Sequence, residues 1–201
     1  MAFLAVFEGI DGSGKTSLSR LFLDHLRAAG TEAAWLREPT DSPLGDRIRR
    51  LAQEEESVPP QRELELFVED RRWDVAHNIL PALRSGTTVV MDRYYYSNAC
   101  YQGARGLDMN AILAANRAFA PEPDLVFIID VEVGRALERI GRARTTVAKL
   151  FERREFLEKV RANYLSLQGP NLAVIDGNPG LEPVFASVLE RWRVFMESKA
   201  K

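Results

Sequence analysis

The sequence predicts an α/β fold in which a parallel, five-stranded sheet lies between two layers of helices. Five short apolar runs alternate with longer amphipathic stretches along the chain. Nearly continuous apolar runs indicate strands that are buried on both faces. Strands that alternate with helices indicate parallel pairing, with helices covering both faces of the sheet. A third observation is a glycine-rich segment that directly follows the first apolar run and precedes a helical pattern.

The predicted elements follow one another in a regular order. We expect strands at residues 3–7, 33–36, 87–91, 125–129 and 172–175. Helical patterns lie at residues 15–29, 44–54, 62–83, 110–118, 133–140, 152–167 and 183–197. Gly30 is expected to end the first helix, because glycine adopts the left-handed conformation that is common just after a helix. The basic, polar segment 141–149 is expected to be mobile.

Composition excludes several classes of protein. The chain has 201 residues, of which 46% are hydrophobic, and this favours one domain over residues 1–201. Lys and Arg together number 27 against 29 Asp and Glu, so the basic excess of a nucleic-acid-binding domain is missing. Cys100 has no partner for an internal disulfide, and the sequence contains neither a signal segment nor a long apolar run. We therefore expect a cytoplasmic protein without nucleic-acid or membrane partners.

The glycine-rich segment predicts a phosphate-binding loop of the P-loop NTPase type. Residues 9–16 match the pattern G-x-x-x-x-G-K-[ST] between a predicted strand and a predicted helix. The glycines let backbone N–H groups converge on phosphate oxygens, Lys15 supplies a positive charge to the β- and γ-phosphates, and Thr16 offers a hydroxyl to Mg²⁺. The predicted ATP-binding residues of this segment are Gly9, Asp11, Gly12, Ser13, Gly14, Lys15, Thr16 and Ser17.

A loop of this type leaves the chemistry open between a phosphotransferase and a GTP-dependent switch. A switch should carry the guanine-binding tetrapeptide Asn-Lys-x-Asp, which the sequence lacks. The Leu-Ser-Gly-Gly signature of transporter ATPases is also missing from the sequence. These two observations favour a kinase.

A second group of polar residues is expected at the carboxyl edge of the sheet, where the loop also lies. Asp92 and Arg93 follow the third strand, Arg37 and Pro39 follow the second, and Arg49 lies one turn into the next helix. An aspartate there suits Mg²⁺ or the acceptor, and an arginine can bind a phosphate through two parallel hydrogen bonds. The alternative is a strand-end ion pair between Asp92 and Arg93. Three arginines at one edge suit a second, phosphorylated substrate.

The chain resembles the thymidylate kinase family over nearly its whole length. The resemblance rests on Phe-Glu-Gly-Ile-Asp-Gly-Ser-Gly-Lys-Thr at 7–16, Arg-Glu-Pro at 37–39, Leu-Phe at 66–67 with Arg71, Asp-Arg-Tyr at 92–94 through Ser97 to Tyr-Gln-Gly at 101–103, Pro-Asp-Leu at 123–125 and Val-Ile-Asp at 174–176. It implies a kinase that transfers the γ-phosphate of ATP to dTMP, giving dTDP for dTTP synthesis, with Mg²⁺ as cofactor. It also implies a homodimer, with residues 62–83 and 110–118 as candidate surfaces.

The resemblance also implies roles on the acceptor side. Phe67 would stack on thymine, Arg71 would reach a base carbonyl, and Asn98 would bond the base edge. Tyr101 would pack beneath the sugar and exclude a 2′-hydroxyl. The dTMP-binding prediction comprises Asp11, Arg37, Pro39, Arg49, Phe67, Arg71, Arg93, Ser97, Asn98, Tyr101 and Gln102, with Arg49 and Arg93 on the phosphate.

The remaining assignments concern catalysis, the metal and adenine. The predicted catalytic residues are Lys15, Asp11, Asp92 and Arg93, and the predicted metal ligands are Thr16 and Asp92. Arg139 matches a position that packs on adenine. Core positions for Phe67 and Tyr101, and a solvated helix position for Arg139, are the alternatives.

Two segments depart from the family pattern. The loop residues 10–13 contain no arginine, so a lid at about residues 141–152 would have to supply a cation, yet Leu150 stands where the family has arginine. The candidates to replace it are Arg142, Arg144, Lys149 and Arg153. Residues 40–42 read Thr-Asp-Ser, where the family more often has glycines. A kinase for another nucleoside monophosphate, and a non-catalytic nucleotide-binding protein, therefore stay open as alternatives.

Overall fold

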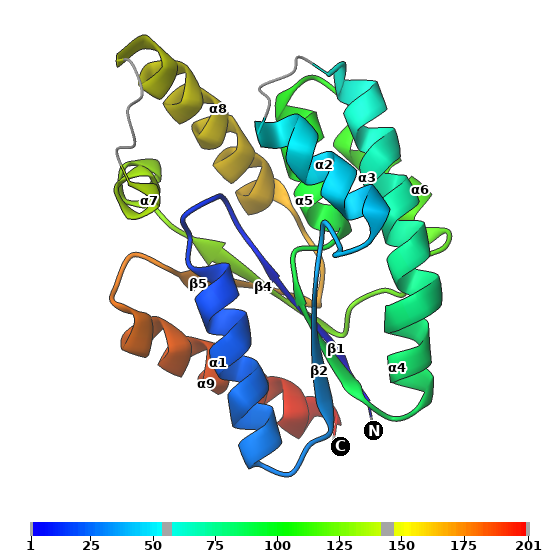
Figure 1. Ribbon diagram of the computed structural model, residues 1–201. Coiled ribbons are helices and arrows are strands. Elements are labelled where there is room, and N and C mark those ends of the chain that lie inside the picture. Colours follow the sequence, from blue (N-terminus) through cyan, green and yellow to red (C-terminus); the bar gives the residue numbers. More distant parts are fainter. Residues whose placement is uncertain (1, 54–57, 142–146, 200–201) are drawn as a thin grey trace.

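A parallel five-stranded sheet forms the centre of the protein (Figure 1). The computed structural model describes residues 2–53, 58–141 and 147–199. The strands are β1 (Leu4–Glu8), β2 (Ala33–Arg37), β3 (Thr88–Asp92), β4 (Leu125–Asp130) and β5 (Leu172–Asp176), in the order β2-β3-β1-β4-β5. The predicted α/β fold with a five-stranded parallel sheet is confirmed.

Every strand extends one residue beyond its apolar run and ends on a charged residue: Glu8, Arg37, Asp92, Asp130 and Asp176. The hydrophobic pattern stops at the last apolar side chain, but the backbone ladder continues, as the pairing of Arg37 with Asp92 shows. Because all five strands are parallel, these charges lie at one edge of the sheet. At this edge β1 is flanked by β3 and β4, where the chain switches from one side of the sheet to the other, and ligands bind at such switch points.

Helices cover both faces of the sheet (Figure 1). One face carries α1 (Lys15–Ala28) and α9 (Leu181–Lys199). The other face carries η1 (Val75–Ile79), α4 (Leu80–Arg84), α5 (Tyr95–Ala104), α6 (Met109–Arg117) and α8 (Val147–Ser166). The remaining helices pack on these: α2 (Pro43–Gln53) lies on α3 (Pro60–Asp74), α3 lies on α5, and α7 (Val133–Ile140) lies on α8.

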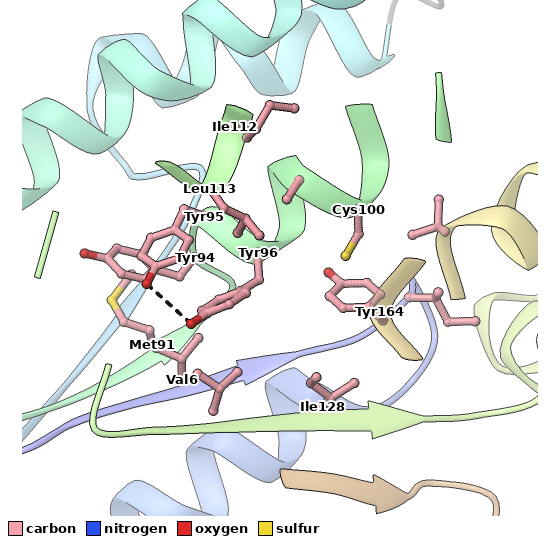
Figure 2. Packing of buried hydrophobic residues seen from close by; sticks show 14 of the residues in the cluster. Val6, Met91, Tyr94, Tyr95, Tyr96, Cys100, Ile112, Leu113, Ile128 and Tyr164 are labelled. Carbon is pink, nitrogen blue, oxygen red and sulfur yellow. Dashed lines mark hydrogen bonds between the residues drawn. The ribbon is translucent and has the colours of Figure 1, made fainter. Parts of the chain in front are cut away.

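The sheet divides the apolar core into two layers, because successive side chains of a strand point to opposite faces. On β1, Leu4 and Val6 belong to the layer beneath α5 and α8, whereas Ala5 and Phe7 belong to the layer beneath α1 and α9. Figure 2 shows the first layer, in which consecutive tyrosines at 94–96 pack against β1 and β3. The edge strand β5 is partly exposed, unlike the central strands.

The predicted helix over residues 62–83 is wrong in its middle, where five residues form the π-helical segment η1. The backbone N–H of Leu80 bonds to the carbonyl of Val75, five residues earlier. Pro81 explains this widening: proline has no N–H and its ring clashes with the carbonyl four residues before it. A π-helical turn accommodates the ring without ending the helix.

Two further helices differ from the prediction. The sequence pattern did not indicate α5, because its tyrosine, serine and asparagine residues are weak helix formers and nearly all of them are buried, which leaves no polar stripe. Helix α8 begins at Val147 and not at residue 152. Of the predicted lid, residues 142–146 lie outside the described residues, as do the side chains of residues 147–152.

Candidate active site

The segment 9–16 connects the carboxyl end of β1 to the first turn of α1. Gly12 and Gly14 have positive φ angles of 79° and 94°, which favour glycine. A side chain at Gly12 would also place its Cβ 2.3 Å from the carbonyl oxygen of Ala136, so the loop depends on glycine there. Thr16 and Ser17 lie exposed at the start of α1. The predicted backbone cradle is therefore present at the end of a helix whose N–H groups face outward.

Lys15 lies buried within this cradle, and its Nζ donates to the carbonyl of Ile10 at 3.1 Å. Burial and, to a smaller extent, the nearby positive charge of Arg93 lower the pKa of Lys15 to about 8, although the charges of Asp11 and Asp92 oppose the shift. A phosphate group beside Lys15 would favour its charged form. The environment of Lys15 is thus suited to an anion.

Asp92 and Thr16 meet beside Lys15. Thr16 Oγ1 donates to Asp92 Oδ2 at 2.5 Å. Within the described chain, the other carboxylate oxygen of Asp92 is buried and has no hydrogen-bond partner. The buried hydroxyl of Ser13 is in the same situation. A carboxylate oxygen and a hydroxyl next to a phosphate cradle are the oxygen ligands that Mg²⁺ prefers.

Arg93 crosses from the phosphate loop to the acceptor side. It has a positive φ of 70°, and its guanidinium donates to the carboxylate of Asp11 and to Ser97 Oγ, the latter at 3.1 Å. The guanidinium carbon also lies 5.2 Å from the centre of the Tyr101 ring. Burial raises the pKa of Asp11, but the charges of Arg93, Lys15 and Arg153 outweigh burial and hold that pKa below its usual value. Asp11 is therefore ionised at neutral pH.

Two hollows meet at Asp11 and Arg93. The first, of about 310 Å³, is lined by Asp11, Gly12, Lys15, Thr16, Arg37, Glu38, Pro39, Arg49, Asp92 and Arg93. The second, of about 230 Å³, is lined by Asp11, Glu38, Pro39, Glu63, Phe67, Arg71, Arg93, Tyr94, Ser97, Asn98, Tyr101 and Gln102. The structure thus brings together the phosphate-loop residues and the residues that the sequence predicted for the acceptor.

Arg71, at the floor of the second hollow, is already extensively paired. Its side chain is 1% exposed. Its Nε and Nη2 donate to the two carboxylate oxygens of Glu38, and Nη1 donates to Asn116 Oδ1 at 2.7 Å. A guanidinium has five N–H donors, so two remain after these bonds. Glu38, not included among the predicted site residues, therefore fixes the orientation of Arg71.

Arg37 and Arg49 line the first hollow but bond to its rim. Arg37 pairs with Asp41 at 2.5 Å, and Arg49 donates to the carbonyls of Pro39 and Thr40 at 3.0 and 2.7 Å and pairs with Asp46 at 2.6 Å. The exposed ion pairs contribute little to stability and leave the arginines accessible. Residues 40–42, where the family pattern is broken, thus form part of the arginine-bearing rim.

Two amides and Tyr101 line the wall of the second hollow. Asn98 Nδ2 donates to Gln102 Oε1 at 3.3 Å, and Gln102 Nε2 donates to Glu63 at 3.2 Å. Asn98 Oδ1 is buried without a partner among the described residues. The hydroxyl of Tyr101 accepts from the backbone N–H of Asp11 at 3.0 Å. These bonds join helix α5 to both the phosphate loop and α3.

Arg139 lies on the opposite side of the phosphate loop from the second hollow. Its guanidinium donates to the carbonyls of Ser13, Gly177 and Pro179 at 3.4, 3.0 and 3.4 Å. These bonds join α7 to the phosphate loop and to the segment after β5, although the side chain of Arg139 is exposed, as the solvated-helix alternative expects. Packing on adenine stays a prediction.

Sequence reasoning missed Glu8, Glu63, Tyr94 and Tyr164 at or beside the site. Glu8 carried no signal of its own, because all five strands end on a charged residue directly after an apolar run. Tyr164 carried no signal either, because it lies on a helix far along the chain. Arg153, one of the four candidate lid cations, is exposed and close enough to affect Asp11.

The fold, the phosphate loop and the adjoining arginine-lined hollow define a P-loop kinase that acts on a small phosphorylated acceptor. The family model described as thymidylate kinase matches residues 7–188. The chain is 42% identical to a probable thymidylate kinase of Archaeoglobus fulgidus, over 98% of this chain and 97% of the relative. It is 38% identical to a thymidylate kinase of Desulfotalea psychrophila over 92% of each chain. The chain belongs to the thymidylate kinase family.

Within the described residues, no helix is both long enough and apolar enough to cross a membrane.

Proposed function

We propose that this protein transfers the γ-phosphate of ATP to dTMP, giving dTDP for the synthesis of dTTP. The observation that supports the proposal most strongly is the junction of the two hollows, which share Asp11, Glu38, Pro39 and Arg93. One hollow contains the phosphate loop and the other is walled by Phe67 and Arg71. A phosphate acceptor in the second hollow would meet the donor phosphates at Arg93.

On the donor side, the backbone N–H groups of residues 9–16 and the ammonium of Lys15 bind the ATP phosphates. Thr16 Oγ1 and Asp92 fit a bound Mg²⁺, because they supply a hydroxyl and a buried carboxylate oxygen that has no partner within the described residues. Bound Mg²⁺ would neutralise phosphate charge during transfer. Arg139 holds the adjoining loops and is proposed to pack on adenine.

On the acceptor side, Arg93 and Arg49 bind the dTMP phosphate, and Arg37 adds positive charge at the rim. Asp11 orients Arg93 through their ion pair. Phosphoryl transfer demands alignment and positive charge more than covalent chemistry from the protein, and these groups supply part of both. Lys15 and Arg93 flank the path of the phosphoryl group.

The base pocket favours an imide such as thymine. Phe67 stacks on the ring, and the free donors of Arg71 face a carbonyl at the base edge. The partnerless Asn98 Oδ1 suits an N–H donor, which N3 of thymine provides. Tyr101 would pack beneath the sugar. Ser97, Gln102 and Pro39 complete the wall.

The proposal is tested by the order of kcat/KM in an ADP-release assay over a panel of nucleoside monophosphates. We expect dTMP first, and dUMP lower by a moderate factor, because loss of the 5-methyl group removes about 1 kcal/mol of apolar contact. We expect dCMP roughly tenfold to a hundredfold lower, because the cytosine amino group faces the donors of Arg71. A preference for dCMP or AMP would contradict the dTMP assignment and leave the P-loop kinase class intact.

We also propose that Arg153 supplies part of the positive charge that the phosphate loop lacks. It is exposed, and its charge contributes to the lowered pKa of Asp11. Its neighbour Arg154 pairs with Glu158 at 3.0 Å and serves as the matched control. Arg153→Ala should lower kcat at saturating substrates, whereas Arg154→Ala should not; equal rates for both variants would exclude this role.

The family resemblance further supports a homodimer, with the faces of α3 and α6 as the candidate surface. Half-exposed aromatic side chains lie in this region: Trp73 stacks on His77, and Phe119 lies 4.1 Å from the guanidinium of Arg72. Sedimentation equilibrium at micromolar concentration is the test. A monomer under those conditions would refute this assembly.

A further inference from the structure

Glu8, the last residue of β1, is a completely buried carboxyl group beside the site, with no role so far. Its Oε1 accepts from the backbone N–H groups of Tyr94 and Ser97 at 2.8 and 3.1 Å. Its Oε2 accepts from Ser97 Oγ at 2.6 Å and from the Tyr164 hydroxyl at 2.8 Å. Four donors thus converge on one carboxyl group, which directly precedes the phosphate loop.

These contacts indicate that Glu8 is a carboxylate. The two backbone N–H groups can act only as donors, and a carboxylate offers about four lone-pair sites for four bonds. Burial raises the pKa of Glu8 above its usual value, and the bonds from Ser97, Tyr164 and Tyr94, with the charge of Arg93, limit that rise. A buried carboxyl group that is fully hydrogen-bonded avoids the cost of an unpaired polar group.

Glu8 also performs a task that a residue of helix α5 normally performs. Tyr94 is the residue that precedes α5, and within the described chain it makes no side-chain capping bond. Glu8, from a different element, accepts instead from the N–H of Tyr94 and from the N–H of Ser97 in the first turn of α5. A negative charge is favourable at a helix N-terminus. Glu8 therefore fixes the start of α5 relative to β1, and Arg93 lies two residues before the first residue of α5.

Ser97 connects Glu8 to the guanidinium of Arg93 through two hydrogen bonds. Ser97 Oγ donates to Glu8 and accepts from Arg93 Nη1 at 3.1 Å. A hydroxyl that donates to a carboxylate becomes a better acceptor, because successive hydrogen bonds polarise one another. The backbone N–H of Arg93 bonds to the carbonyl of Phe7 in β1 at 3.0 Å. The backbone of Arg93 is therefore held by β1 directly, and its guanidinium is held by β1 through Ser97 and Glu8.

Tyr164 adds a connection to helix α8. Its hydroxyl lies 3.0 Å from Ser97 Oγ as well as 2.8 Å from Glu8. Figure 2 shows Tyr164 of α8 beside Cys100 of α5, in the buried layer above β4. The group formed by Glu8, Ser97 and Tyr164, which we name the Glu8 cluster, thus joins β1, α5 and α8 directly behind Arg93.

We propose that Glu8 is a positioning residue for Arg93: through Ser97 and the start of α5, it holds the guanidinium in the orientation that binds the acceptor phosphate. The proposal rests on the function proposed above, in which Arg93 contacts the phosphate of dTMP. Glu8 itself lies behind Arg93 and touches neither hollow.

A purely structural role for Glu8 predicts a different outcome from a positioning role. Loss of a structural contact lowers stability and affects every ligand alike. Loss of a positioning contact weakens ligands that bear the acceptor phosphate and leaves the nucleoside unaffected. Thymidine shares the base and sugar of dTMP but lacks the phosphate, so the pair of ligands separates the two roles.

Glu8→Gln is the central variant, because glutamine keeps the shape and one acceptor oxygen for the two backbone N–H groups. Its amide group would donate to Ser97 and Tyr164, so that Ser97 Oγ no longer donates to a carboxylate. By calorimetry, we expect dTMP affinity to fall about tenfold, the loss of one charge-assisted hydrogen bond, with thymidine affinity within about twofold of wild type. Equal losses for both ligands, or no loss for dTMP, would overturn the proposal.

Tyr164→Phe provides a second measurement if Glu8→Gln fails to fold. It removes one donor from Glu8, and we expect dTMP affinity to fall about two- to fivefold with thymidine unchanged. Tyr96→Phe is the matched control, because Tyr96 is equally buried and its hydroxyl bonds to that of Tyr95 at 3.4 Å and not to Glu8 or Ser97 (Figure 2). Equal effects of the two phenylalanine variants would overturn the proposal.

Wild-type kinetics distinguish the failure of this inference from the failure of the proposed function. If the wild-type protein does not phosphorylate dTMP, the function is wrong, whatever the variants do. If it does, the KM for dTMP should rise in Glu8→Gln while the KM for ATP stays near the wild-type value. An active wild type with an unchanged KM for dTMP in Glu8→Gln would refute the positioning role alone.

Discussion

The phosphate-loop side and the acceptor side of the site differ in how the protein prepares them for a ligand. In and beside the loop, Ser13 Oγ and Asp92 Oδ1 are buried without partners among the described residues, and the glycines hold an open backbone cradle. On the acceptor side, Arg71 and Arg93 already bond to carboxylates of the protein. The first region leaves its bonds for the ligand, whereas the second uses protein bonds to orient its cations.

This difference teaches how each region depends on its residues. A backbone cradle depends on glycine at certain positions and on one lysine, and Ile10 is its one residue in the apolar core. A network of buried ion pairs depends on both partners of each pair, because removing one leaves an uncompensated charge. Substitutions in the loop should therefore affect transfer, and substitutions in the acceptor network should affect both stability and selectivity.

The largest effect is expected from Lys15→Ala. Loss of the ammonium should lower kcat by about 10³-fold or more, because each cation on a transferring phosphoryl group can contribute that much. The fold should persist, since Lys15 makes a single bond, to the carbonyl of Ile10, among the described residues. Lys159→Ala, on the exposed face of α8, is the control. Turnover close to wild type in Lys15→Ala would contradict the assignment of the phosphate loop.

Glu38→Gln tests the acceptor network through stability. The substitution removes the negative charge and replaces one of the two acceptor oxygens that face the buried guanidinium of Arg71 with an N–H donor, while the bond to Asn116 stays. We expect the free energy of unfolding, measured with urea, to fall by about 3 kcal/mol or more. Glu65→Gln is the matched control, because Glu65 pairs with Arg62 on the exposed face of α3, the helix that carries Arg71. Loss of this exposed ion pair should cost less than about 1 kcal/mol. Equal losses of unfolding free energy in the two variants would show that the buried Glu38–Arg71 pair contributes no more to stability than an exposed pair.

The sequence also predicted the phosphate loop more completely than the acceptor network. The loop could be predicted residue by residue, because its chemistry depends on a fixed local spacing between Gly9 and Thr16. The sheet could be predicted because each strand is an apolar run, and the error was one residue at the charged ends. Local spacing and local hydrophobicity are properties that a sequence displays directly.

The arginines and amides of the acceptor network could be predicted, but the carboxylates that pair with them and the bonds of the network could not. Arg71 and Glu38 are 33 residues apart, and Glu8 and Tyr164 are 156 apart, so the sequence alone does not reveal which partners meet. Helix α5 was missed because its buried polar residues bond to other elements, and the helical period does not show such bonds. The π-helical turn before Pro81 was missed because proline predicts a disturbance but not the form that it takes.

The smallest effect concerns Asp74, which tests the electrostatic cost of the acceptor network. Asp74 is 1% exposed, and its Oδ2 has no hydrogen-bond partner within the described chain. Burial raises its pKa from 3.8 to about 6, and the nearby charge of Asp70 acts in the same direction, while a hydrogen bond from Asn78 opposes the shift. Because the folded pKa is the higher one, the folded state binds the proton more tightly than the unfolded chain does. The contribution of Asp74 to stability is therefore fully present below about pH 4 and is lost as the pH rises through about 6.

Asp74→Asn keeps the shape of the side chain and removes its titration. At pH 7 the variant should be more stable than the wild type by about 2 kcal/mol, and the difference should shrink towards pH 4. Asp46→Asn, at an exposed position in α2, is the control and should show a far smaller pH-dependent difference. The measurement is urea unfolding of all three proteins from pH 4 to pH 8; a stability difference between Asp74→Asn and wild type that does not change with pH would contradict the assignment of a raised pKa to Asp74.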